Sequence, residues 1–131
     1  MQDLMLPQLT YEIETCKRLL NFITDENVHL KNRLSAVLKD NFEKNMLEEM
    51  ENYLSKFVAQ DELMNLLKYD LSKIEKRLWG KIHEDSEIAK DVYTGLRLLQ
   101  SNILKAEGLF FQLCGDFNNF LCGRIIDIKG A

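Results

Sequence analysis

Apolar residues recur at every third or fourth position along three long segments of this chain. The clearest segment is 43–79, where the repeating positions hold Met46, Met50, Tyr53, Phe57, Gln60, Met64, Leu67, Leu71, Ile74 and Leu78. This spacing predicts a helix with one continuous apolar face. At 1.5 Å of rise per residue the helix is about 55 Å long. A single rod cannot bury its own apolar face, so we expect other helices of the chain to cover it.

The segments before and after show the same periodicity and predict two further helices. The first, 8–39, begins just after Pro7, which suits a first helical turn, and the third is 86–122. Gly80 favours an end to the middle helix just after Trp79. The repeating positions are Leu9, Ile13, Cys16, Leu20, Ile23, Asn27, Leu30, Leu34 and Val37 in the first helix, and Ala89, Val92, Leu96, Leu99, Ile103, Ala106, Phe110, Leu113, Phe117 and Phe120 in the third.

Short connections make successive helices antiparallel neighbours. The sequence therefore predicts an all-α fold, an antiparallel up-down-up bundle of three long, coiled-coil-like helices forming one domain over residues 1–131. The tail, 123–131, receives no secondary-structure prediction.

Asn27 and Gln60 are the two polar residues on these apolar faces. A first turn centred near Asn41 or Phe42 places them within one layer of the bundle. A second turn near 82–83 sets Gln60 opposite Lys105 or Ala106. Because Ala106 is small, it leaves room for two amides. Because an unpaired buried amide is costly, we expect Asn27 and Gln60 to form a polar core layer and to hydrogen-bond to each other, directly or through water.

The charge balance argues against two classes of partner. The formal net charge is −4 and the isoelectric point about 5.2, whereas nucleic acids and anionic membrane surfaces call for a basic face. The start of the chain lacks the pattern of a signal peptide, and no apolar run is long enough to cross a membrane. Cys16, Cys114 and Cys122 are odd in number and have no CxxC spacing. We therefore predict a cytoplasmic protein with reduced cysteines.

Two chemical roles, metal ligand and phosphoacceptor, can be considered for His29. Glu26 and His29 have the Glu-x-x-His form of ferritin-like di-iron bundles, but those need the motif twice and further inward carboxylates. The apolar positions hold no Glu, and Gly80 stands three residues before His83, so we predict no metal and no cofactor. The run His29-Leu30-Lys31 resembles the phosphoacceptor region of histidine phosphotransfer domains, with Asn32 where that family has Gly. The resemblance implies a phosphoacceptor role for His29; the alternative is a surface residue paired with Asp25.

The outward side of the third helix departs from the usual pattern of a solvated face. Opposite the apolar stripe, Thr94, Ser101, Gly108, Gly115 and Cys122 recur at heptad spacing, and Leu104 and Phe111 form a second outward column. A helix whose side chains are small or apolar on all sides is typically buried on all sides. We therefore predict an interface formed by Ser101, Leu104, Gly108, Phe111, Gly115 and Cys122. The alternatives are that 124–129 folds back over this side, or that the helix breaks near Gly115.

No phosphate-binding loop, dinucleotide-binding or nucleophile-elbow motif occurs in the sequence. The function expected from these patterns is that of a non-catalytic interaction or scaffolding module. Its expected partner is a second copy in a homodimer, or another helical protein, with no nucleic acid and no membrane. The alternatives are a histidine phosphotransfer protein with His29 as acceptor, and a bundle that binds an apolar ligand between its helices.

Overall fold

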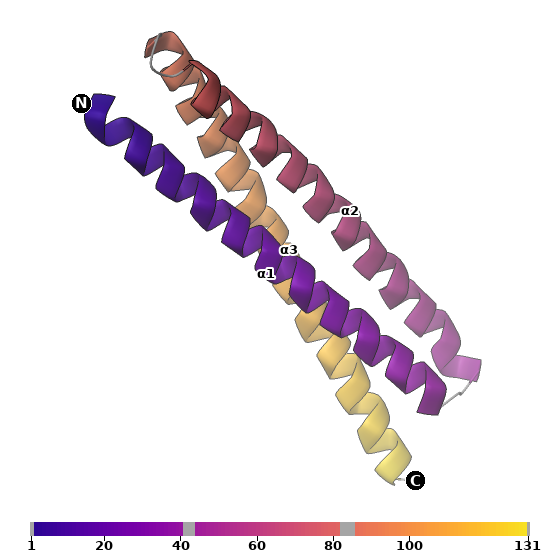
Figure 1. Ribbon diagram of the computed structural model, residues 1–131. Coiled ribbons are helices and arrows are strands. Elements are labelled where there is room, and N and C mark those ends of the chain that lie inside the picture. Colours follow the sequence, from indigo (N-terminus) through magenta and orange to yellow (C-terminus); the bar gives the residue numbers. More distant parts are fainter. Residues whose placement is uncertain (1, 41–43, 82–85, 131) are drawn as a thin grey trace.

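The computed structural model is an all-α bundle of three long helices, as the hydrophobic pattern predicts (Figure 1). Helix α1 spans Gln2–Asp40, α2 spans Lys44–Lys81 and α3 spans Ser86–Gly130. The structure describes the backbone of residues 2–40, 44–81 and 86–130, and the side chains of 5–39, 46–80 and 89–123. The turn residues proposed for capping, such as Asn41, and His83 lie outside the described residues.

Helices α1 and α3 run in the same direction and α2 runs against both (Figure 1). All three pairs of helices are in contact, which confirms the antiparallel up-down-up arrangement. In Figure 1, α3 crosses behind α1, and its C-terminal end runs past the C-terminal end of α1. Within the described chain, no helix is both long and apolar enough to cross a membrane.

The core is built from the repeating apolar positions of all three helices. Its largest fully buried side chains include Phe57 of α2 and Phe110 and Phe117 of α3. The rings of Phe57 and Phe117 meet edge to face, with centroids 5.1 Å apart, and Tyr53 lies 5.2 Å from Phe117. Burying a large apolar side chain stabilises a fold by about 1.5–3 kcal/mol, so this aromatic cluster is a main link between α2 and α3.

All three helices extend further than the sequence predicts. Pro7 lies inside α1 rather than in its first turn, because the helix begins at Gln2. Gly80 does not end α2: the helix continues to Lys81, and no glycine in the described chain has a positive φ. Since a left-handed glycine is what makes a C-terminal stop, that prediction is wrong for Gly80.

The buried stripe of α3 shifts by one position toward its C-terminal end. Leu121 is buried and Phe120 only half-buried, although the predicted pattern placed Phe120 on the apolar face. A straight helix has 3.6 residues per turn, so a strict seven-residue repeat drifts around it by about 20° per heptad. Over the length of α3 this drift brings the neighbouring position into the core.

The packing of α3 against α2 is displaced from the predicted register. Phe57 contacts Phe117, and Ile74 lies beside Gly95. Gln60 is one turn further along α2 than Phe57, so it faces a part of α3 about one to two helical turns toward the C-terminus from the predicted Ala106. The centre of the second connection alone did not fix this offset, because the large aromatic side chains of both helices set how they interlock.

Candidate interaction surface

All six residues of the predicted interface lie on the surface of α3. Ser101, Gly108, Gly115 and Cys122 are exposed, while Leu104 and Phe111 are 63% and 52% exposed. We call these six residues the outward face of α3. Exposed apolar side chains that recur along one side of a helix form a contiguous surface and are typical of a contact with another molecule.

The glycines of this face have no intramolecular role. A Cβ atom added at Gly108 or at Gly115 would meet no atom within 4 Å, and the same holds for Gly123. Gly95 differs, since its added Cβ would lie 3.8 Å from Ile74. Glycine inside a helix costs about 0.8–1 kcal/mol relative to alanine. Packing within the bundle therefore does not explain why Gly108 and Gly115 are glycine.

The two intramolecular alternatives for this face are both wrong. Helix α3 is continuous through Gly115, and the tail is helical to Gly130. A helix that continues along its own axis cannot turn its last residues back over its outward side. The outward face of α3 is thus left uncovered by the chain.

The two polar core residues are buried, and Asn27 makes hydrogen bonds that the sequence did not predict. Asn27 is fully buried and Gln60 is 7% exposed. The Asn27 amide nitrogen donates to the carbonyl of Phe57 at 2.8 Å and to a carboxylate oxygen of Asp61 at 2.7 Å. Within the described residues no direct bond joins Asn27 to Gln60. Asn27 Oδ1 and Gln60 Nε2 are buried without a partner. The prediction missed Asp61, which flanks the apolar stripe beside Gln60.

Asp61 links this layer to the surface through an ion pair with Lys31. Burial alone would raise the pKa of the Asp61 carboxyl, but the hydrogen bonds from Lys31 and Asn27 outweigh burial and lower the pKa below its ordinary value of 3.8. The carboxylate is therefore held in its charged form between two donors on α1. This cluster fixes the register of α1 against α2.

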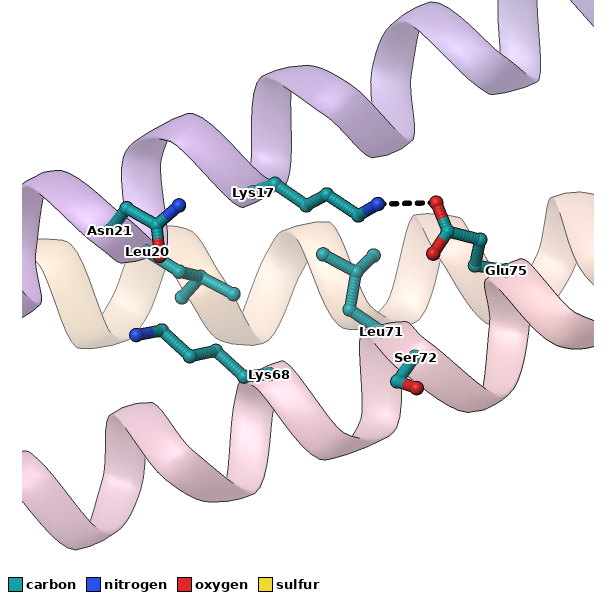
Figure 2. A pocket seen from close by; sticks show the side chains of 7 residues that line it. All are labelled: Lys17, Leu20, Asn21, Lys68, Leu71, Ser72 and Glu75. Atoms are coloured by element: carbon teal, nitrogen blue, oxygen red, sulfur yellow. Dashed lines mark hydrogen bonds and ion pairs between the residues drawn. The ribbon is translucent and has the colours of Figure 1, made fainter.

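A second cross-helix pair borders a surface groove between α1 and α2 (Figure 2). Lys17 pairs with Glu75 over a floor formed by Leu20 and Leu71, and Lys68 lies on the other side of that floor. Leu20 and Leu71 belong to the core, so the groove is shallow. Lys17 and Glu75 flank the apolar stripes, where charged pairs commonly align helices; the stripe analysis alone did not reveal them.

Polar contacts also join α1 to α3, and sequence reasoning missed them. Arg97 pairs with Glu12 at 2.8 Å, and Arg33 donates to the side-chain oxygen of Asn118 at 2.6 Å. Glu12 is largely buried, its side chain 13% exposed, and Oε2 has no partner. These contacts bridge α1 and α3, which share the smallest contact of the three pairs.

Among the described residues, His29 and the three cysteines form no reactive cluster. His29 is exposed, and the described residues contain no ion pair between it and Asp25. Cys16 is buried, Cys114 half-buried and Cys122 exposed, all as free thiols. Burial raises the pKa of the Cys16 and Cys114 thiols, which disfavours the reactive thiolate. No group of three His, Cys, Asp or Glu side chains in the described chain is placed to hold a metal ion.

Comparison with known proteins adds no assignment: no protein-family model, curated protein or solved structure matches this chain.

Proposed function

We propose that this protein is a non-catalytic helical-bundle interaction module that associates with a second copy of itself through the outward face of α3. The observation that carries the proposal is the exposure of Leu104 and Phe111 beside two glycines, Gly108 and Gly115, that no packing within the chain requires. Glycine lets another backbone approach closely. The helix-propensity cost of the two glycines is then offset when a second helix packs against them.

The low charge of this side of α3 supports the same proposal. Between residues 98 and 122, the exposed positions of α3 carry two full charges, Lys105 and Asp116. Solvated helix faces normally carry several charges, whereas the centre of a protein interface is depleted of them. Arg97, at the edge of the same side, is engaged by Glu12.

The proposal is tested by the mass of the protein in solution. At tens of micromolar, light scattering should give the mass of a dimer. The double variant Gly108→Glu with Gly115→Glu should give a monomer of unchanged helicity by circular dichroism, because buried, unpaired carboxylates at the contact oppose association.

The matched control places the same two charges elsewhere. Ser55 and Asn65 are exposed on α2, so Ser55→Glu with Asn65→Glu should leave the dimer intact. A wild-type protein that stays monomeric at tens of micromolar would sink the proposal. The outward face of α3 would then be a surface for a different helical protein.

A further inference from the structure

The polar contacts between α1 and α3 show which of their residues lie at the same level along the bundle. Arg33 and Asn118, which are hydrogen-bonded, stand 85 positions apart in the chain. Glu12 and Arg97 have the same separation and form the other contact. Because α1 and α3 run in the same direction (Figure 1), this constant offset pairs the levels of the two helices.

Between these two contacts, apolar side chains of both helices lie together at the surface. Leu104 of α3 is level with Leu19 of α1, and Phe111 follows two turns later on the same side of α3. Phe22 lies three residues beyond Leu19, so these two are neighbours on α1. Leu19 is half-buried, whereas Phe22 is 49% exposed. We call Leu19, Phe22, Leu104 and Phe111 the α1–α3 face.

Three carboxylates surround Phe22 at the centre of this face. Asp25 and Glu26 lie three and four residues beyond Phe22, so both are its neighbours on the surface of α1. Glu107 of α3 is level with Phe22, and Glu26 is level with Phe111. Glu26 and Glu107 are half-buried. In the described part of the chain, none of the three carboxylates takes part in an ion pair or a hydrogen bond.

The negative charge of Glu26 acts across the contact between α1 and α3. Burial raises the pKa of the Cys114 thiol on α3, and the Glu26 carboxylate raises it further. A nearby anion disfavours the thiolate form of a cysteine. The Glu26 carboxylate therefore lies close enough to α3 to meet a partner that packs on both helices.

The cations nearest to the α1–α3 face lie at its edges. Arg33 and Arg97 are engaged in the two contacts that bound the face. Arg18 donates to a hydroxyl of its own helix at 3.0 Å. Lys105 is turned by about 100° from Leu104, toward the α2 side of α3. The centre of the face therefore combines apolar side chains with negative charge alone.

The flank of α3 that faces α2 is also apolar in part, but its charges are mixed. Leu98 and Leu109 are exposed there. The groove beside Leu98 is lined by Asp70, Lys73 and Arg77. Charges of both signs give this flank no preference for an acidic or a basic partner. Only the α1–α3 face, of these two, specifies the charge of what it contacts.

We propose that the α1–α3 face binds a basic amphipathic helix of another protein. The apolar side of that helix packs on Phe22, Leu104 and Phe111, and its lysine or arginine side chains pair with the three carboxylates around Phe22. An apolar partner without cations would instead leave half-buried carboxylates desolvated and unpaired, which is costly. The basic helix is distinct from the second copy proposed above. Both use Leu104 and Phe111, so a bound helix displaces that copy.

Fluorescence anisotropy with a synthetic peptide tests this site. The probe is a labelled helical peptide of about 18 residues, about 27 Å long, with leucine along one side and lysine on both flanks of the leucines. The control peptide carries glutamate in place of each lysine. In dilute solution the basic peptide should bind and the acidic peptide should not. Binding of neither peptide, or of both equally, would overturn the proposal.

The part played by charge is tested by two double variants of equal net charge. Glu26→Gln with Glu107→Gln should raise the dissociation constant of the basic peptide about tenfold, because two carboxylates beside the apolar contact are lost. Glu51 and Glu62 are exposed on α2. Since distant exposed charges are screened by salt, Glu51→Gln with Glu62→Gln should change the constant less than about threefold. Equal effects would mean attraction to the net charge of the chain and would overturn the site.

The apolar part is tested by a second matched pair of substitutions. Phe22→Ser should weaken binding of the basic peptide about tenfold, as truncation of a central contact residue does. Leu66 of α2 is also exposed, at 56%, and Leu66→Ser should change the dissociation constant less than about threefold. Equal effects of the two variants would remove Phe22 from the site and overturn the proposal.

These measurements separate the basic helix from the second copy. A wild-type dimer that does not bind the basic peptide overturns the α1–α3 site alone. A wild-type monomer that binds the peptide overturns the self-association alone.

Discussion

The buried side-chain amides of Asn27 and Gln60 differ in the hydrogen bonds that they make. Asn27 places both of its bonds on α2, through the Phe57 carbonyl and the Asp61 carboxylate. The Asn27 side-chain oxygen and the Gln60 amide nitrogen are both buried without a partner, so only Asn27 is bonded across to α2. A buried donor left unpaired costs about 1–3 kcal/mol, so Asn27 holds α1 and α2 together while Gln60 destabilises the same layer.

Replacing Gln60 should therefore stabilise the protein. Gln60→Met keeps the length of the side chain and removes the unpaired donor, so we expect the free energy of unfolding to rise by about 1 kcal/mol, measured by urea denaturation. Asn27→Leu is the companion variant and should be destabilising, because it breaks two bonds. A loss of stability in Gln60→Met would show that the Gln60 amide is satisfied.

Asp61 gives the bundle a pH-dependent contribution to stability. Because its pKa is lowered in the folded state, the contribution is complete above the ordinary value of 3.8 and is lost as the pH falls below it through the lowered pKa. Asp61→Asn should reduce the free energy of unfolding at pH 7 by about 0.5–1.5 kcal/mol and flatten its decline below pH 4.

Asp25→Asn removes the same charge at an exposed position of α1 and serves as the control for this pH series. We expect it to change stability at pH 7 by less than about 0.5 kcal/mol. If the two variants behave alike, the pairing of Asp61 with Lys31 and Asn27 does not stabilise the fold.

Helix α3 combines a well-packed inner side with an outer side that carries glycine. Its inner residues, such as Ile103 and Phe110, are buried, whereas Gly108 is exposed and its Cβ position is open. Alanine at position 108 would favour the helix, whereas glycine favours the close approach of a second helix. The substitution Gly108→Ala therefore separates helix stability from association.

Gly108→Ala should stabilise the monomer and weaken the dimer. The helix gains about 0.8–1 kcal/mol from alanine, visible as increased resistance to urea under dilute, monomeric conditions. A methyl group at this position keeps a second helix from approaching closely, so sedimentation should show weaker association. Gly123→Ala, also open to solvent and outside the outward face of α3, is the control and should leave association unchanged. Stronger association of Gly108→Ala would contradict close approach at this residue.

The regular spacing of apolar residues predicted the three helices well because it continues along three long segments with few interruptions. It placed nearly all of the buried side chains on the correct face, including both amides. It did not predict where the helices end, since Gly80 and the tail remained helical. The contacts of Asp61, Arg97 and Arg33 were also missed, because a stripe defines a face but not the offset between helices. That offset follows from how large side chains interlock.

At the scale of the whole molecule, the odd number of helices leaves an electrostatic imbalance. The dipoles of α1 and α3 point the same way and only α2 opposes them, so one helix dipole remains uncompensated. It is equivalent to roughly half a charge at each end of α3, about 65 Å apart. A second copy set antiparallel would place a positive end beside a negative end and cancel this backbone contribution. A second copy set parallel would instead double it.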